Sequence, residues 1–84
     1  MQFRFDPAKA ALNLRKHGVS LADAESVFQD PLALHREGPD TEGEARFVAI
    51  GVANDGVTLV LVYTIHREVI RLISSRHGSG EKSL

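Results

Sequence analysis

Two apolar segments separated by a turn signal constrain the fold of this chain most. Residues 47–53 and 57–66 are rich in Val, Ile and Leu, and Asn54-Asp55-Gly56 lies between them. This pattern is typical of a β-hairpin, because Asn, Asp and Gly accept the backbone angles of a tight turn. Residues 69–76 form a third apolar segment after Arg67-Glu68. The sequence therefore predicts an antiparallel meander.

Helices are predicted before the meander. Asp6-Pro7 indicates the start of a helix that runs to about His17 and ends at Gly18, since aspartate caps free amides and proline needs no donor in the first turn. Ser20 begins a second helix that ends at Asp30-Pro31. The apolar stripe of this second helix consists of Leu21, Ala24, Val27 and Phe28.

The order of elements indicates the fold class. A short edge strand is expected at residues 2–5, where polar and aromatic residues alternate, and a weak strand at 32–36. One strand, two helices and then three or four strands predict an α+β domain with helices on one face of an antiparallel sheet. Because 84 residues suffice for one core, we expect a single domain over residues 1–76 and a flexible tail over 77–84.

Composition excludes several classes of protein. The chain has no cysteine, which excludes a disulfide framework, a thiolate zinc site and a cysteine nucleophile. Its four histidines, at positions 17, 35, 66 and 77, lack the spacing of known metal motifs, so we expect no metal and no other cofactor. No apolar run is long enough to span a membrane and no signal peptide begins the chain, which predicts a cytoplasmic protein without membrane contact.

The net charge of −1 is unevenly distributed. Residues 1–20 carry four basic side chains against one acidic, and residues 46–84 carry five against three. Residues 21–45 carry seven acidic side chains against one basic. A fold that brings the two ends together would have a basic face able to contact phosphates, and the alternative is a mixed, solvated surface.

Basic and titratable side chains gather on the first predicted helix. Lys9, Asn13 and Lys16 share one polar stripe, which suits a phosphodiester backbone but is also typical of a solvated helix face. His17 lies at the end of this helix, where an imidazole either complements the helix dipole or transfers protons.

The last predicted hairpin carries a second cluster, which includes His66, Arg71 and Arg76. Such side chains can bind phosphate oxygens and stabilise transition-state charge, or they simply keep an edge strand from aggregating. A two-residue turn at Arg67-Glu68 would put His66, Thr64 and Arg71 on one face, with Arg76 on the other beside Tyr63. A three-residue loop would put His66 and Arg76 on the same face.

An ordered set of segments resembles the BrnT toxins. The matching segments are Phe5-Asp6-Pro7-Ala8-Lys9, Asn13, Lys16-His17-Gly18-Val19-Ser20, Val27-Phe28-Gln29-Asp30-Pro31, Glu42-Gly43-Glu44-Ala45-Arg46-Phe47, Ile50-Gly51, Val62-Tyr63-Thr64 and Arg71-Leu72-Ile73-Ser74-Ser75-Arg76. The resemblance implies a type II toxin with a RelE-like ribonuclease fold that cleaves RNA and inhibits translation. It also implies a BrnA-type antitoxin, whose ribbon-helix-helix part binds operator DNA, so that the toxin reaches DNA only through the antitoxin.

The resemblance also implies roles for individual residues. Lys9 and Arg71 are expected to contact RNA phosphates together with Lys16, Arg76 to stabilise transition-state charge, and His17 or His66 to transfer the proton of the ribose 2′-hydroxyl. This chain has His66 where the family commonly has arginine, and it stops soon after Arg76. The alternative is a weakened toxin that binds its antitoxin as a co-repressor, and a plain nucleic-acid-binding domain is a third possibility.

Overall fold

The structure, a computed structural model, describes residues 2–38 and 45–78. Its elements are β1 (Gln2–Arg4), α1 (Pro7–His17), α2 (Leu21–Ala24), the 3-10 helix η1 (Glu25–Gln29), β2 (Leu34–Glu37), β3 (Arg46–Val52), β4 (Thr58–His66) and β5 (Val69–His77). β5 extends one residue beyond the predicted end of the domain at residue 76. The predicted tail from residue 79 onward lies outside the described residues, and so does most of the polar loop at 37–44. No described helix is long and apolar enough to cross a membrane.

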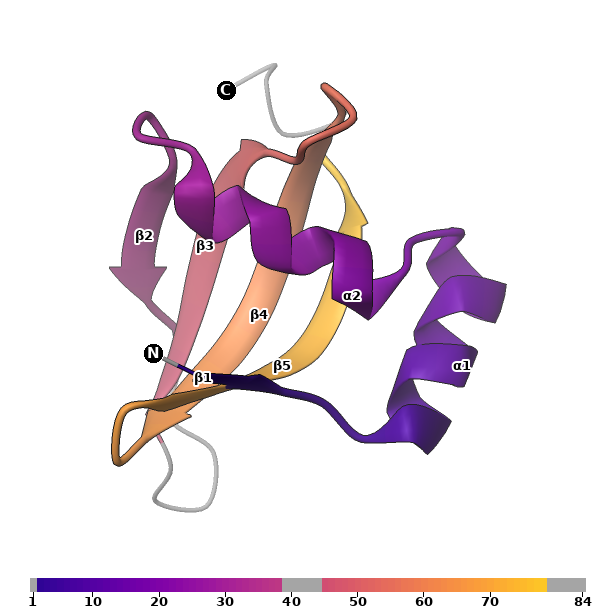
Figure 1. Ribbon diagram of the computed structural model, residues 1–84, viewed down its shortest axis with the longest axis horizontal. Coiled ribbons are helices and arrows are strands. Elements are labelled where there is room, and N and C mark those ends of the chain that lie inside the picture. Colours follow the sequence, from indigo (N-terminus) through magenta and orange to yellow (C-terminus); the bar gives the residue numbers. More distant parts are fainter. Residues whose placement is uncertain (1, 39–44, 79–84) are drawn as a thin grey trace.

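The five strands form one sheet in the order β1-β5-β4-β3-β2 (Figure 1). Strands β2 to β5 are the predicted antiparallel meander. β1 is an edge strand, as predicted, but it pairs with β5 in parallel. The predicted sheet of three or four antiparallel strands is therefore extended by a parallel fifth strand. Both helices lie between β1 and β2 in the chain, and they carry it from the edge formed by β1 to the opposite edge, where the meander begins with β2.

The predicted bounds of the first helix are confirmed. The Asp6 carboxylate accepts a hydrogen bond of 3.0 Å from the Ala8 amide at the start of α1. Gly18 has a φ of 69°, and its amide donates to the Leu14 carbonyl at 2.8 Å. A left-handed residue at this position closes a helix and satisfies a carbonyl that would otherwise be free.

The second predicted helix is divided into α2 and η1. The Ser20 hydroxyl caps α2 by accepting from the Asp23 amide at 3.4 Å. Past the end of η1, the Asp30 carboxylate accepts from the amides of Leu32 and Val52 at 2.9 and 2.8 Å. The hydrogen bond from Val52 attaches the end of η1 to β3, and both hydrogen bonds hold the pKa of Asp30 below its usual value of 3.8.

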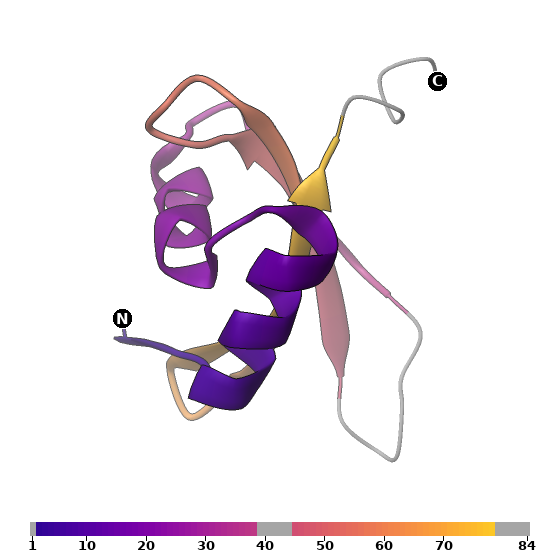
Figure 2. The ribbon, with the colours of Figure 1, turned by 90° about the vertical axis from the view of Figure 1, so that its right-hand side faces the viewer.

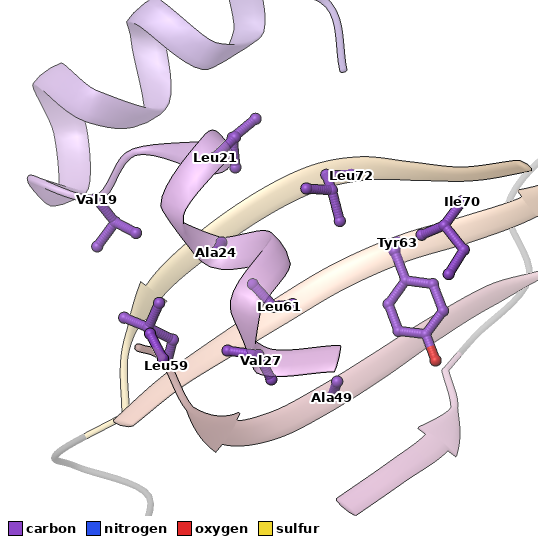
Figure 3. Packing of buried hydrophobic residues seen from close by; sticks show 11 residues of the cluster. Val19, Leu21, Ala24, Val27, Ala49, Leu59, Leu61, Tyr63, Ile70 and Leu72 are labelled. Atoms are coloured by element: carbon purple, nitrogen blue, oxygen red, sulfur yellow. The ribbon is translucent and has the colours of Figure 1, made fainter. Parts of the chain in front are cut away.

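The core lies between the sheet and the helices α2 and η1 (Figure 3). Leu21, Ala24 and Val27 of the predicted stripe are each at most 1% exposed, whereas Phe28 is half-buried and packs against the Tyr63 ring. The sheet contributes Ala49, Leu59, Leu61, Tyr63, Ile70 and Leu72. We call this the covered face of the sheet. No described helix lies over the opposite face, which we call the open face (Figure 2).

α1 is attached at the edge of β5 through a polar side chain. Asn13 is the one buried residue of α1, and its Oδ1 accepts from the Ser75 amide at 3.0 Å. Its Nδ2 donates to the carbonyls of Ser75 and Val19, both at 2.9 Å. This amide thus pairs with the β5 backbone as a further strand would. Both interpretations of the polar stripe, a phosphodiester contact and a solvated helix face, were wrong for Asn13, because its polar atoms are occupied inside the protein.

Candidate active site

The turn between β4 and β5 has the two-residue form. His66 pairs with Val69 and Thr64 pairs with Arg71, so these four side chains share the open face. The turn residues Arg67 and Glu68 have φ angles of 51° and 67°. Neither is glycine, so both carry the strain that left-handed backbone imposes on a Cβ. The structure therefore holds Arg67 beside His66 in a strained turn.

A β-bulge in β5 changes the face on which Arg76 lies. Tyr63 pairs with Leu72 but Val62 pairs with Ser74, which leaves Ile73 as the extra residue. Past the bulge, Arg76 pairs with Val60. The expectation that a two-residue turn separates Arg76 from His66 was wrong, because the bulge shifts the alternation by one residue and returns Arg76 to the open face.

The parallel pairing of β1 with β5 places two arginines side by side. Arg4 lies opposite Arg71, and both are exposed. The basic N-terminal segment thereby meets the basic C-terminal strand, as the uneven charge distribution allowed. Sequence reasoning did not select Arg4 as a site residue, because a three-residue strand gives no signal for its partner. The net positive charge of residues 1–20 was the one indication in the sequence that Arg4 could belong to the site.

Arg4 and Arg71 line two adjoining hollows. The first, of about 500 Å³, is bounded by Arg4, Thr64, His66, Arg67, Val69 and Arg71. The second, of about 360 Å³, is bounded by Arg4, Phe5, Asp6, Lys9, Arg71, Leu72 and Ile73. The two hollows share both arginines, so the pair forms the boundary between them.

A third hollow, of about 240 Å³, continues the line along α1. Its boundary consists of Lys9, Leu12, Asn13, Lys16, His17, Ile73 and Ser74. It shares Lys9 and Ile73 with the second hollow. We call the three hollows together the basic groove. It runs from His66 at the β4–β5 turn, past Arg71 and Lys9, to His17 at the end of α1.

The groove is strongly basic. Among the residues that the structure describes, five exposed cationic side chains line it against a single carboxylate, that of Asp6, which caps α1. The five are Arg4, Lys9, Lys16, Arg67 and Arg71. Spaced cations along an open groove neutralise successive phosphates of a nucleic acid strand, and arginine additionally binds two phosphate oxygens at once.

Five of the six predicted site residues line the groove. They are Lys9, Lys16, His17, His66 and Arg71. The sixth, Arg76, does not line any of its three hollows, and it lies five residues beyond Arg71, roughly 15 Å away at the rise of a strand. His17 and His66 lie at opposite ends of the groove, so they do not act on one bond together.

Tyr63 lies outside the groove. It is 4% exposed on the covered face, and its hydroxyl forms a hydrogen bond of 2.9 Å with Nδ1 of His35. Burial raises the pKa of Tyr63 above its ordinary value of 10.0. Its ring stacks on Phe47 with the centroids 5.5 Å apart. Tyr63 therefore belongs to the aromatic part of the core.

Comparisons with known proteins identify the family and the fold of this chain. Residues 5–81 match the family described as the ribonuclease toxin BrnT of type II toxin-antitoxin systems. The chain is also similar to the crystal structure of the Brucella abortus ribonuclease toxin BrnT, with a TM-score of 0.68 and 26% sequence identity over 94% of this chain and 97% of that chain. No curated protein matches the chain.

Proposed function

We propose that this chain, which belongs to the BrnT family of ribonuclease toxins of type II toxin-antitoxin systems, cleaves RNA in the basic groove. One observation carries the proposal. Arg4 and Arg71 lie between two adjoining hollows, with Lys9 in one and His66 in the other. A phosphate bound at the arginine pair would therefore have an imidazole on one side and a further cation on the other.

The chemistry of RNA cleavage matches these side chains. His66 accepts the proton of a ribose 2′-hydroxyl, and the 2′-oxygen attacks the adjacent phosphorus. Arg71 and Arg4 stabilise the charge that develops on the phosphate oxygens, a role first expected of Arg76. The bond from phosphorus to the 5′-oxygen breaks, and a solvent proton neutralises the leaving oxygen. The products are a 2′,3′-cyclic phosphate and a 5′-hydroxyl.

The rest of the groove extends the RNA contact beyond the cleaved bond. Lys9 adjoins the arginine pair, and Lys16 and His17 line the third hollow. We assign Lys9 and Lys16 to neighbouring phosphates, where each cation adds affinity that falls with rising salt concentration. His17 contacts the strand at the far end of the groove and takes no part in proton transfer.

Cleavage of a defined single-stranded RNA by the purified chain tests the proposal. Arg71→Ala and His66→Ala are each expected to lower the cleavage rate about 100-fold, the usual loss for a transition-state contact or a general base. Mass spectrometry of the fragments identifies the cyclic phosphate. Lys16→Ala is expected to weaken RNA binding and to reduce its salt dependence, with little change in the rate at saturating RNA.

Arg15→Ala is the matched control for these variants. Arg15 is adjacent to Lys16, is exposed and does not line the groove, so its loss removes the same charge without a groove contact. Cleavage that survives Arg71→Ala and His66→Ala unchanged would contradict the proposed site. An intact RNA with the unmodified chain would favour the alternative, a weakened toxin that serves as a co-repressor with its antitoxin.

A type II toxin has an antitoxin partner, and we propose that the partner of this chain is a BrnA-type protein. Its ribbon-helix-helix part would bind the operator, so that the complex represses the genes for both proteins. Free toxin would cleave cellular RNA and thereby inhibit translation. Expression of the chain alone and with this antitoxin, followed by measurement of RNA integrity and protein synthesis, tests both statements.

A further inference from the structure

The open face of the sheet combines an apolar centre with a basic margin. Besides Val69 at the β4–β5 turn, alternation along the described strands places six aliphatic side chains there. They are Leu34, Val48, Ile50, Val52, Val60 and Val62. Leu34 is 71% exposed and Val52 44%, and Val60, although buried, lies outside the hydrophobic core cluster. The apolar residues of this face are thus separate from the core.

The charged side chains of the open face are all basic. Among the described strand residues that face this side there are five arginines and one histidine, and no aspartate or glutamate. They are Arg4, Arg36, Arg46, His66, Arg71 and Arg76. Arg36 on β2 lies to one side of the apolar centre, and the arginines of β5 and β1 lie to the other.

Arg46 extends the basic margin of this face across the sheet. It pairs with Thr64, which pairs in turn with Arg71, so it belongs to a row that crosses the sheet. Its Nε is buried and has no hydrogen-bond partner in the structure. Because this atom is enclosed by the protein, the contribution of Arg46 to a docked partner is its positive charge.

We propose that an acidic, amphipathic helix of the antitoxin docks on the open face. A helix about 10 Å wide covers two strands spaced 4.8 Å apart, here β3 and β4 with their valines and Ile50. From Val48 to Val52 the apolar centre is roughly 13 Å long, which corresponds to two or three helical turns. The apolar stripe of such a helix contacts this centre, and its carboxylates contact the arginines on both sides.

The composition of the face favours a protein helix over RNA. Single-stranded RNA binds through bases stacked on aromatic rings. Phe3, Phe47 and Tyr63 all lie on the covered face, where Phe3 and Tyr63 pack with Phe28 and Phe47 stacks on Tyr63. The apolar side chains that the described strands present on the open face are all aliphatic, and these suit another apolar surface.

The location of the helix has a consequence for activity that rests on the proposed function. Arg4, His66 and Arg71 belong both to the open face and to the basic groove. A carboxylate bound to these cations occupies the position of the phosphate. The antitoxin would therefore inhibit cleavage by competing with RNA for the same arginines.

Affinity measurements with the BrnA-type antitoxin, made by calorimetry on the full chain, test the docking surface. Leu34→Glu and Arg36→Glu are each expected to weaken binding at least 10-fold, since both place a negative charge against the acidic helix. Leu32→Glu is the matched control, because Leu32 is 84% exposed but precedes β2 and is not part of the open face. The Leu32→Glu variant is expected to bind the antitoxin as tightly as the unmodified chain does.

RNA cleavage by the same variants separates this inference from the proposed function. Neither Leu34 nor Arg36 lines the groove, so both variants are expected to cleave RNA at the normal rate and to resist inhibition by the antitoxin. Unchanged antitoxin affinity in both would overturn the docking surface, whether or not RNA is cleaved. Loss of RNA affinity in both would assign the face to RNA, and a dimer of the free chain broken by Leu34→Glu would assign it to a second copy.

Discussion

Replacement of Asn13 by alanine should destabilise the protein far more than its position on a surface helix suggests. The change removes three hydrogen bonds of 2.9 to 3.0 Å and leaves the amide and carbonyl of Ser75 without this partner. Each hydrogen bond contributes about 1 kcal/mol, and orphaned buried groups add to the loss, so we expect a decrease of about 3 to 4 kcal/mol in the free energy of unfolding. In a domain of this size that corresponds to a fall in Tm of about 12 to 32 °C.

Urea unfolding of the variant and the unmodified chain measures this decrease directly. Leu14→Ala is the matched control on the same helix, because Leu14 is 54% exposed and its truncation should cost under about 1 kcal/mol. Asn13→Asp should cost at least as much, since it keeps the acceptor for the Ser75 amide but places a buried carboxylate oxygen against the carbonyls of Ser75 and Val19. A loss below about 1 kcal/mol for Asn13→Ala would refute the inference that this amide attaches α1 to β5.

Three further predictions concern backbone positions and one carboxylate. Gly51→Ala should lower the free energy of unfolding by about 1 to 3 kcal/mol, because the new Cβ would lie 2.7 Å from the Ala33 Cβ. Gly38→Ala is the control, and equal Tm values for the two variants would contradict this packing. Glu68→Gly should raise Tm, since it relieves about 1 kcal/mol of strain at a φ of 67°, and an unchanged Tm would mean that the turn is not strained. Asp30→Asn should lower Tm near neutral pH. Because the pKa of Asp30 is depressed in the native state, the stabilisation by its carboxylate is present above pH 3.8 and is lost as pH falls through the native pKa. The Tm values of the variant and the unmodified chain should therefore converge at acid pH, and a Tm difference that stays constant would exclude the carboxylate as the cause.

Local sequence determined where the elements begin and end. Asp6 and Gly18 define both ends of α1, and Asn54-Asp55-Gly56 separates β3 from β4, as predicted. These features are set by interactions within a few residues, such as a side-chain cap or a left-handed glycine. The same is true of the apolar stripe from Leu21 to Val27, since helical spacing alone places its members on one face.

Sequence also selected most of the candidate site. Residue type and helical spacing identified Lys9 and Lys16, and the last hairpin identified His66 and Arg71. The resemblance to the BrnT family, carried by short segments in a fixed order, agreed with the family match over residues 5–81.

Only the tertiary structure decided which of these residues meet. The parallel pairing of β1 with β5 brings Arg4 beside Arg71, the bulge at Ile73 returns Arg76 to the open face, and Asn13 serves as an edge partner for Ser75. Each depends on residues distant in the chain and on the register in which strands pair. A three-residue strand or a single extra residue leaves too weak a local signal, because the free energy that selects its register comes from packing across the whole sheet.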